Sequence, residues 1–542
     1  MKIKTVTIKN FKCLGDQELT IDLSDDIVVL IGENNVGKSS FLEALRYFFS
    51  GKIIPKDLFY EGKTGEENAI ELTVEFNSLT TADKEHQAIK PYFISDGGEE
   101  VWVLKKKYYY SNDGKGECKY WAKKVDGKWI KDPAGLKQVS DDLFTNEKMQ
   151  VPFIGAVKDV EEETSSGAKA AFGQIFNILI KADVEKQKEY VTLQAAIEDY
   201  TKLFEGEKKL SSISSLEKSI DQKMQRVING VSKIQLDTPS FKDKILPNPV
   251  LLTNDQREID VKPGFQGNGY QRALIFSLLE LLAEQASPKT KEIGPRNLIL
   301  IEEPEMYMHP QMERKIADAL YEIARDGSAQ IVCTTHSPIF INVADKHKAL
   351  VRLNRGHDNK VVLSQVSKEI FSGATKEENK ARLRMILNFD PTVNEVFFAK
   401  RVVLVEGDTE VAVFKESAEL LGIFHDEKNR HLKRDVTFVN CRGKWTIVAF
   451  QEVLNHFKID YVVIHDKDDS DEKTGANAKI LELLQGDENR RKLCDKYIEE
   501  ELGIKEGKSK PFNALQRIQE LADAHKLESQ FGAIVNFAYG LT

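Results

Sequence analysis

The sequence predicts an α/β protein in two parts: an N-terminal part interrupted by a helical insertion, and a smaller C-terminal α/β domain. Two observations support this fold class. Near the N-terminus an apolar run enters a glycine-rich loop and then a helical pattern, and near the C-terminus two apolar runs each end in acidic residues. The 542 residues suffice for about two to four domains, each with its own core.

The glycine-rich loop follows Ile27 to Ile31, which have the length and β-branching of a buried strand. The letters GENNVGKS fit G-x-x-x-x-G-K-[ST], and a helical pattern follows them. Glycines let backbone amides turn toward phosphate oxygens, and the helix N-terminus adds its positive dipole end. In such a loop the lysine reaches the β- and γ-phosphates and the serine holds Mg²⁺. We therefore predict that ATP and Mg²⁺ bind at Gly32, Asn35, Gly37, Lys38, Ser39 and Ser40.

Composition sets limits on the class of protein. Lys and Arg number 77 and Asp and Glu 86, so the net charge of −9 does not indicate nucleic-acid binding, although a local basic groove remains compatible with it. The five cysteines form no C-x-x-C pair, so neither a zinc site nor a disulfide framework is indicated. The sequence shows no signal-peptide core and no apolar run of about 20 residues. We expect a cytoplasmic protein that does not enter a membrane.

Alternating apolar and polar residues predict several strands besides the buried one. These are Lys2 to Phe11, Gln17 to Leu23 and Ala69 to Phe76. Val101 to Tyr110 and Cys118 to Ile130 are typical of β-hairpins, with turns expected at 112–114 and 126–127. The lysines at 105 to 107 precede three tyrosines, which gives two interpretations. The preferred one is a strand with one solvated face, and the other is a basic-aromatic patch for nucleic acid.

Helical spacing dominates from Ala168 to about Gln235, with turns expected at Glu205-Gly206 and from Ser211 to Ser215. We interpret this stretch as a helical hairpin or bundle whose role is dimer contact, a lever, or plain packing. The expected domains are an ATPase in residues 1–165 and 246–370, a helical insertion in 166–245, a linker in 371–395 and a C-terminal domain in 396–542.

Two further segments complete the expected nucleotide site. The strand-like run NLILIEEPE, Asn297 to Glu305, ends in carboxylates that suit a Walker B element. Glu302 would hold the Mg²⁺ shell and Glu303 would polarise the attacking water. A third strand, Gln330 to Cys333, ends just before His336, which we expect to sense the γ-phosphate.

The ordered set GENNVGKS, GNGYQR, LILIEEPEMYMHP and TTHS resembles an ABC-type ATPase head of the SMC-like class. In that class two heads sandwich ATP, and the glycine-rich signature of one head faces the P-loop of the other. The resemblance implies that Gly267 and Gly269, ahead of a helix expected from Ala273 to Ala286, bind nucleotide in trans. Hydrolysis would then need dimerisation.

The C-terminal domain contains two acid-tipped strands. RVVLVEGDTE places Glu406 at the end of one apolar run, and YVVIHDKDD places Asp466 and Asp468 at the end of another. Carboxylates at the carboxyl ends of two strands can converge on hard cations, and oxygen-only ligands suit Mg²⁺ or Mn²⁺. Two such ions could activate water and stabilise the leaving oxygen of a phosphodiester. The alternative for either run alone is that the acid is a helix cap.

Together the two runs resemble a TOPRIM domain. The resemblance maps the metal-binding carboxylates to Glu406, Asp466 and Asp468, and places Glu410 where the nuclease branch has a second glutamate. Lys510, in KSKPF, falls where related nucleases place a lysine that could neutralise a pentavalent phosphate. The surrounding KEGKSK run is equally compatible with a solvated loop.

An ABC head followed by a TOPRIM domain resembles the OLD (overcoming lysogenization defect) family of ATP-dependent nucleases, which includes the Gabija nuclease subunit. The resemblance implies a metal-dependent DNA endonuclease that assembles as a dimer or tetramer through the ATPase and serves anti-phage defence. Members of such families work with a helicase-like protein or in a retron, with reverse transcriptase and noncoding RNA, and the sequence does not choose between these partners. Nor does it decide whether ATP activates or inhibits cutting.

Two other functions are weighed against the nuclease. One is a non-cutting, SMC-like ATPase that clamps DNA, which leaves the acidic C-terminal residues without a role. The other is a primase or topoisomerase, ranked lower because the sequence shows neither a tyrosine-transesterification domain nor a zinc-binding segment.

Overall fold

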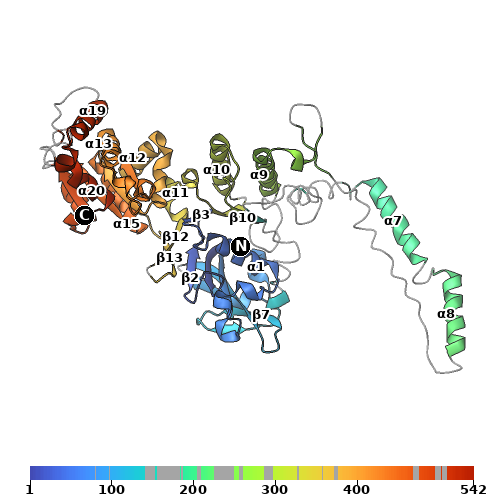
Figure 1. Cartoon of the computed structure of the whole chain (residues 1–542). Helices are drawn as coiled ribbons and strands as arrows, with labels where there is room; N and C mark the ends of the chain where they lie inside the picture. Colours follow the sequence, from blue (N-terminus) through green and yellow to red (C-terminus); the bar gives the residue numbers. More distant parts are fainter. Residues whose placement is uncertain are drawn as a thin grey trace. The chain divides into compact units, whose positions relative to one another are not determined.

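A computed structural model gives the fold of the chain (Figure 1). It describes residues 1–140 (without 80, 97 and 139), 153–155, 187–203, 209–224, 250–285 (without 255–259), 297–467 (without 326, 328, 357 and 372–375), 475–494 and 510–541, with the single residues 172, 184, 498 and 502. Contacts divide the chain into two compact units. Unit 1 comprises Met1–Ala156 and Pro288–Thr542, and unit 2 comprises Val157–Ser287.

Unit 1 begins with an antiparallel sheet in the strand order β2-β1-β4-β6-β7-β8, with β5 paired to β6. The strands predicted from alternation are therefore confirmed. Their bounds are β1 (Lys2–Lys9), β2 (Leu19–Asp22), β4 (Ile70–Asn77), β5 (Phe93–Asp96), β6 (Glu99–Tyr110), β7 (Gly116–Lys123) and β8 (Trp129–Lys131). The short helix α2 (Thr81–Glu85) follows β4.

The lysines of β6 serve the sheet itself. Lys105 and Lys107 both bind the carboxylate of Glu71 on β4, at 2.9 and 2.5 Å. Lys106 points the other way, is 1% exposed, and donates from its Nζ to the carbonyl of Phe48 at 2.8 Å. These contacts favour the interpretation as a strand over that as a nucleic-acid patch, because two lysines are paired and the third is buried.

A second sheet carries the glycine-rich loop, in the order β13-β12-β3-β11-β10-β9. All neighbouring strands are parallel except β12 and β13. The carboxyl ends of the parallel strands therefore lie at one edge, where ligands of such sheets bind. The bounds are β3 (Ile27–Gly32), β9 (Phe153–Ile154), β10 (Asn297–Glu302), β11 (Ala329–Thr334), β12 (Leu350–Arg355) and β13 (Val361–Gln365).

Helix α1 (Lys38–Ser50) lies between the two sheets and contacts β4 of the first and β3, β10 and β11 of the second. The apolar face predicted for it is confirmed, because its phenylalanines and leucines are all buried and belong to one core with residues of both sheets. Helices α10 (Pro310–Arg325), α11 (Val343–Lys346) and α12 (Lys376–Phe389) complete this part of unit 1.

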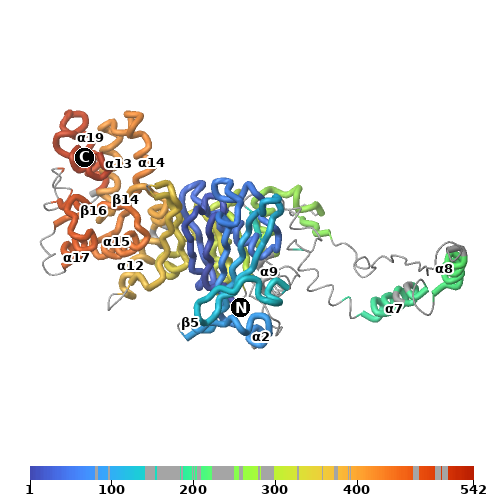
Figure 2. The backbone as a smooth tube through the Cα atoms, turned by 90° about the horizontal axis from the view of Figure 1, so that it is seen from below, coloured from blue at the N-terminus to red at the C-terminus, as the bar shows by residue number. Residues whose placement is uncertain are grey.

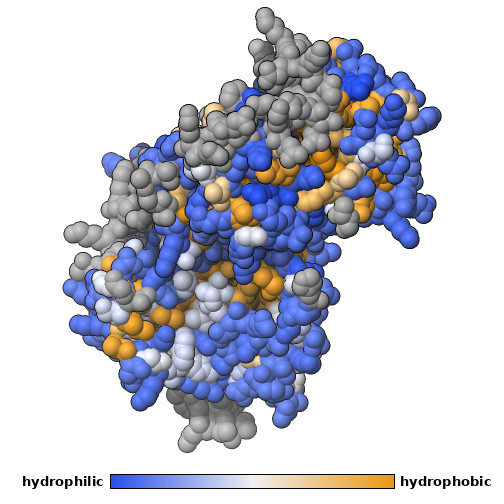
Figure 3. All heavy atoms as spheres, turned by 90° about the vertical axis from the view of Figure 1, so that its left-hand side faces the viewer, coloured by the Kyte–Doolittle hydropathy of each residue, from blue (hydrophilic) through white to orange (hydrophobic). Residues whose placement is uncertain are grey.

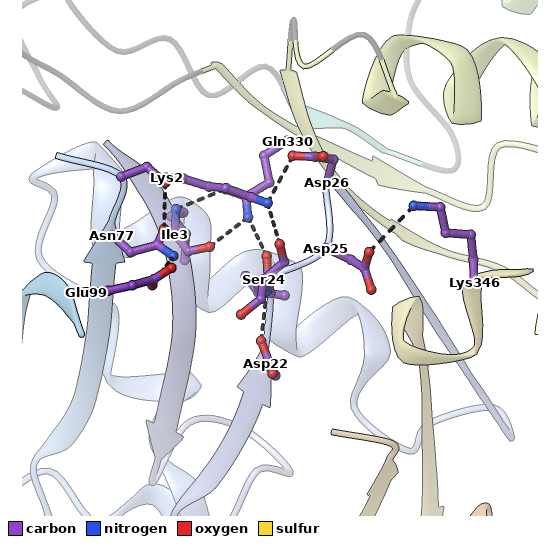
Figure 4. A network of polar contacts seen from close by, with 12 residues as sticks. Lys2, Ile3, Asp22, Ser24, Asp25, Asp26, Asn77, Glu99, Gln330 and Lys346 are labelled. Atoms are coloured by element: carbon purple, nitrogen blue, oxygen red, sulfur yellow. Dashed lines mark hydrogen bonds and ion pairs between the residues drawn. The ribbon is translucent and has the colours of Figure 1, made fainter. Parts of the chain in front are cut away.

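One buried side chain ties the two sheets together where β1 and β11 begin (Figure 4). The Gln330 amide oxygen accepts the Ile3 N–H at 3.1 Å, and its nitrogen donates to the carbonyls of Ile3 and Leu23 at 2.7 and 2.6 Å. Gln330 is 2% exposed. Because buried backbone groups need partners, this amide fixes the first strand to the loop-bearing sheet.

The C-terminal domain of unit 1 is a parallel sheet in the order β15-β14-β16-β17. Figure 2 shows β14 and β16 between α13 and α19 on one side and α15 and α17 on the other. The bounds are β14 (Arg401–Val405), α13 (Asp408–Leu420), α14 (Leu432–Asp435), β15 (Val436–Asn440), α15 (Lys444–His456), β16 (Tyr461–Asp466), α17 (Ala476–Leu483), β17 (Arg491–Cys494), α19 (Lys510–Asp523) and α20 (Ala533–Tyr539).

Unit 2 contains helices α7 (Lys188–Lys202), α8 (Ser211–Met224) and α9 (Asn268–Gln285). The turn predicted from Ser211 to Ser215 is wrong: these serines begin α8, since serine is favoured where a helix starts as well as in turns. The other predicted turn, Glu205-Gly206, lies outside the described residues. Helix α9 begins at Asn268, earlier than the Ala273 expected.

The surface matches the high charged fraction of the sequence. Hydrophilic side chains cover most of the face seen in Figure 3, with hydrophobic ones gathered in patches between them. Within the part of the chain that the structure describes, no helix combines the length and apolarity that crossing a bilayer would need.

We expect Gln330→Leu to lower the free energy of unfolding by about 2–4 kcal/mol, because it leaves backbone groups of Ile3 on β1 and of Leu23, just after β2, without the amide that binds them. Urea unfolding followed by circular dichroism measures this. The matched control is Gln365→Leu. The side-chain amide of Gln365 also hydrogen-bonds backbone groups, those of Asp22 and Lys348, but it is less buried than Gln330. Equal losses in the two variants would contradict the prediction.

Candidate active sites

The glycine-rich loop joins β3 to α1 in a shape that requires its glycines. Gly32 and Gly37 have φ values of 144° and 111°, in the region that favours glycine. A Cβ at Gly32 would lie 2.0 Å from the carbonyl oxygen of Leu353 on β12. At the tip of the loop Asn35 has a φ of 60°, and its carbonyl accepts from Arg355 Nη2 at 2.9 Å. Two residues of the neighbouring strand β12, Leu353 and Arg355, thus contact the loop and hold it in place.

Lys38 folds back over this loop and is 5% exposed. Its Nζ donates to the carbonyls of Gly32 and Glu33, each at 2.9 Å. Burial lowers the pKa of Lys38, and the carboxylates of Glu303, Glu305 and Glu302 act in the opposite direction. The ammonium therefore lies in the field of the acidic turn after β10.

The two serines after Lys38 face different surroundings. Ser39 is exposed at the start of α1, whereas Ser40 is buried and its hydroxyl lies 3.6 Å from the sulfur of Cys13. Ser39 is therefore the hydroxyl that an incoming cation can reach.

The acidic turn after β10 lies beside the turn after β11. The parallel register pairs Glu302 with Thr334, and the Glu303 amide donates to the Thr334 carbonyl at 3.0 Å. Glu303 has a φ of 45°, a conformation that non-glycine residues seldom adopt and that often marks functional sites. Its carboxylate lies 3.6 Å from Nε2 of His336. Acid and imidazole are thus neighbours, as the order of the motifs predicts.

The electrostatics of this turn keep His336 neutral. Burial and the Lys38 ammonium lower the pKa of His336 below its usual 6.5, and Glu303 opposes them. A neutral imidazole at pH 7 has one nitrogen that donates and one that accepts.

Glu305, a residue not among those predicted from the sequence, joins the two turns. Its Oε1 accepts the backbone N–H of His336 at 2.7 Å. Burial raises the pKa of Glu305, against the hydrogen bonds from His336, its own backbone and Thr335. The available signal was a further carboxylate in EEPE, directly after the proline.

The two acid-tipped strands of the C-terminal domain are direct neighbours. β14 pairs in parallel with β16, with Leu404 opposite Val463. Glu406 follows β14 and Asp466 ends β16, so both lie at the carboxyl edge of the sheet. The Asp466 amide donates to Oε2 of Glu406 at 3.1 Å. Both residues thus lie at one edge of the sheet, and the convergence of their carboxylates on a metal ion stays a prediction.

Glu410 lies in the first turn of α13 and is 6% exposed. A Cβ at Gly407 would lie 3.1 Å from Oε2 of Glu410, so the carboxylate turns back toward the strand end. Burial raises the pKa of the Cys441 thiol, with further contributions from the carboxylates of Glu406 and Glu410. Both carboxylates therefore lie near the same cysteine at the end of β15.

The remaining predicted site residues are placed less fully. Asp468 lies outside the described residues, and for Lys510 the structure gives only its place at the start of α19. Among the described residues no group of three or more His, Cys, Asp or Glu side chains is close enough to hold a metal ion. The donors present at the edge, carboxylates of Glu406, Glu410 and Asp466, have the chemistry that hard divalent cations prefer.

The two glycines predicted to form the signature, Gly267 and Gly269, belong to unit 2. Gly267 directly precedes α9, and Gly269 lies in its first turn. A Cβ added at Gly267 meets nothing within 4 Å, so the glycine leaves open space beside the start of the helix.

One arginine connects the loop-bearing sheet to the C-terminal domain. Arg352 of β12 donates from Nε to the carbonyl of Phe397 at 3.2 Å and from Nη1 to that of Phe457 at 3.4 Å. It lines a cavity of about 380 Å³ together with Glu33 of the loop and Lys400 before β14. Arg352 thus joins β12 of the loop-bearing sheet to the segments at Phe397 and Phe457.

This fold and these sites define a P-loop ATPase joined to a TOPRIM-type domain. Two family profiles match the chain. One is described as AAA ATPase domain and matches residues 1–341, and the other is described as overcoming lysogenization defect protein-like, TOPRIM domain, and matches residues 397–468. The chain therefore belongs to the AAA ATPase domain family and carries an OLD-like TOPRIM domain. The α/β fold class and the resemblance to OLD proteins are confirmed, and such a pair of domains uses a nucleotide and a divalent metal.

Several named relatives align over most of the chain. The chain is 25% identical over 480 residues to the OLD nuclease of Thermus scotoductus, covering 86% of this chain and 82% of that protein. It is 23% identical over 484 residues to the Old nuclease of Escherichia phage P2, covering 86% and 77%. Endonuclease GajA of Bacillus cereus is 23% identical over 438 residues, covering 77% and 67%. Among solved structures, the SMC head bound to the C-winged helix domain of ScpA covers 68% of this chain and 98% of its own, with 14% identity and a TM-score of 0.41.

We expect Glu305→Ala to slow ATP hydrolysis about tenfold while nucleotide binding is kept, because the His336 amide loses its acceptor and the two turns separate. A phosphate-release assay and fluorescent-nucleotide titration measure the two effects. Glu322→Ala is the matched control, since Glu322 is an exposed acid on α10. A hydrolysis rate in Glu305→Ala equal to that of the unchanged protein would contradict the role of the Glu305–His336 hydrogen bond.

Proposed function

We propose that the protein is an ATP-binding, metal-dependent DNA endonuclease whose cutting is regulated by its ATPase, and that it serves anti-phage defence. The observation that carries the proposal is the meeting of Glu406 and Asp466 at the carboxyl edge of a TOPRIM-type sheet. Relatives that bear the names OLD nuclease and endonuclease GajA, aligned across both domains, support it.

On the ATPase side, Lys38 binds the β- and γ-phosphates and Ser39 holds Mg²⁺ together with Glu302. Glu303 orients the attacking water and His336 contacts the γ-phosphate. The supporting geometry is the 3.6 Å approach of His336 to Glu303 and the proximity of both to Lys38. The loop residues Gly32, Asn35, Gly37 and Ser40 shape the cradle, and Gly267 and Gly269 act on the nucleotide of a second copy.

On the nuclease side, Glu406, Glu410, Asp466 and Asp468 hold Mg²⁺ or Mn²⁺. When bound, such ions supply an activated water and stabilise the leaving oxygen of the phosphodiester. The protein side chains orient the ions at the edge of the sheet, and Lys510 neutralises charge on the phosphate. The donor chemistry of the described carboxylates supports this assignment.

We place the ATPase in residues 1–165 and 246–370, with the insertion 166–245 mediating a homodimer or tetramer. The linker 371–395 leads to the nuclease domain, 396–542. DNA is the substrate, and a helicase-like protein or a retron with its reverse transcriptase and noncoding RNA is the partner class. We place the protein in the cytoplasm.

The test incubates the full chain with supercoiled plasmid and Mg²⁺ or Mn²⁺. We expect Glu406→Ala to abolish strand scission and leave ATP turnover unchanged, because the carboxylate lies in the C-terminal domain. Lys38→Ala is expected to abolish ATP turnover, and the direction of its effect on cutting reveals whether ATP activates or inhibits.

Glu416→Ala, at an exposed acid of the same helix α13, is the matched control and should cut normally. The competing function, a DNA clamp, predicts ATP-dependent retention of DNA and no scission by any variant or by the unchanged protein. That result, or scission undiminished in Glu406→Ala, would overturn the proposal.

A further inference from the structure

A buried lysine lies close to the acid-tipped edge without being one of its expected metal ligands. Lys444 begins α15, directly after Gly443, and is 9% exposed. The Gly443 N–H donates to the backbone carbonyl of Glu406 at 3.1 Å, so the start of α15 is tied to the strand that carries the glutamate. Burying a lysine is unfavourable unless its ammonium is bound, so this position calls for an explanation.

The Lys444 ammonium binds the segment between the two expected aspartate ligands. Its Nζ donates to the carbonyl oxygen of Lys467 at 3.2 Å. The side-chain nitrogen Nδ2 of Asn477, at the start of α17, donates to the same oxygen at 2.7 Å. The N–H of Lys467 in turn donates to the carbonyl of Cys494 on β17 at 3.0 Å. Both ends of one residue's backbone are therefore fixed by three different elements.

We infer that Lys444 and Asn477 are positioning residues that, by holding the backbone of Lys467, keep the preceding Asp466 in the arrangement that receives the metal. Lys467 separates two metal ligands of the proposed nuclease, so the inference rests on that function. A residue fixed at both its N–H and its carbonyl cannot rotate freely, so the orientation of Asp466, directly before it, is constrained as well. Because side chains that orient metal ligands act on affinity, their loss typically weakens metal binding about 10–100-fold.

The charge of Lys444 adds to its role as a donor. An ammonium needs acceptors, and the described surroundings offer it the carbonyl of Lys467. Arginine keeps the charge and a donor at this position, whereas methionine keeps the approximate length and removes both. The two substitutions therefore separate the hydrogen bond from the packing of the side chain.

The experiment measures Mn²⁺ binding to the full chain without nucleotide, by electron paramagnetic resonance of the free ion. We expect Lys444→Met and Asn477→Ala each to weaken Mn²⁺ binding about tenfold, with unchanged ATP turnover and thermal unfolding. Lys444→Arg should restore most of the affinity. The double variant should lose less than the product of the single losses, because both side chains act on one oxygen.

Two references make the outcome decisive. Lys479→Met removes a lysine of α17 that pairs with Glu482, and it should bind Mn²⁺ normally. Glu406→Gln removes a proposed ligand, so the Mn²⁺ that this variant still binds measures the ions held elsewhere on the chain. If Glu406→Gln loses Mn²⁺ while Lys444→Met and Asn477→Ala keep it, the positioning role is wrong and the proposed function stands. If Glu406→Gln keeps Mn²⁺, the proposed metal site itself is wrong.

Discussion

The hydrogen bond from the Asp466 amide to the Glu406 carboxylate is the contact on which the functional account depends. It exists because β14 and β16 are parallel neighbours, so that residues some 60 positions apart leave the sheet at the same edge. Parallel pairing cannot bring one acid to that edge and the other to the opposite one. A shift in this register would move Glu406 away from Asp466 and remove the shared edge that the proposed ion site needs.

The same principle builds the nucleotide side. β3, β10 and β11 are parallel, and the loop, the acidic turn and the His336 turn all follow their carboxyl ends. Lys38 donates to two carbonyls of the loop and lies in the field of three glutamates. The site therefore places a positive charge next to negative ones even without a bound phosphate. Arg352, on the strand beside β3, reaches the carbonyls of Phe397 and Phe457. The sheet that carries the glycine-rich loop is thus bonded through one side chain to backbone segments next to the C-terminal sheet.

Much of this could be predicted from the sequence because the signals are local. The short motif GENNVGKS places glycines at the two positions, Gly32 and Gly37, whose positive φ values favour glycine. The acid-tipped strands are visible as apolar runs that end abruptly in acidic residues. The residues that were missed act over tertiary distances. Lys444 meets Lys467 only because α15 begins beside the end of β16, and Glu305 meets His336 only because β10 and β11 are neighbours. The serines at the start of α8 were misassigned because the same residue type favours turns and helix starts.

The most direct measurement is an anomalous-scattering map from crystals of the protein grown with Mn²⁺. We expect a strong peak within coordination distance of the carboxylates of both Glu406 and Asp466. Mn²⁺ bound only at the P-loop, with the two carboxylates free of metal, would contradict it.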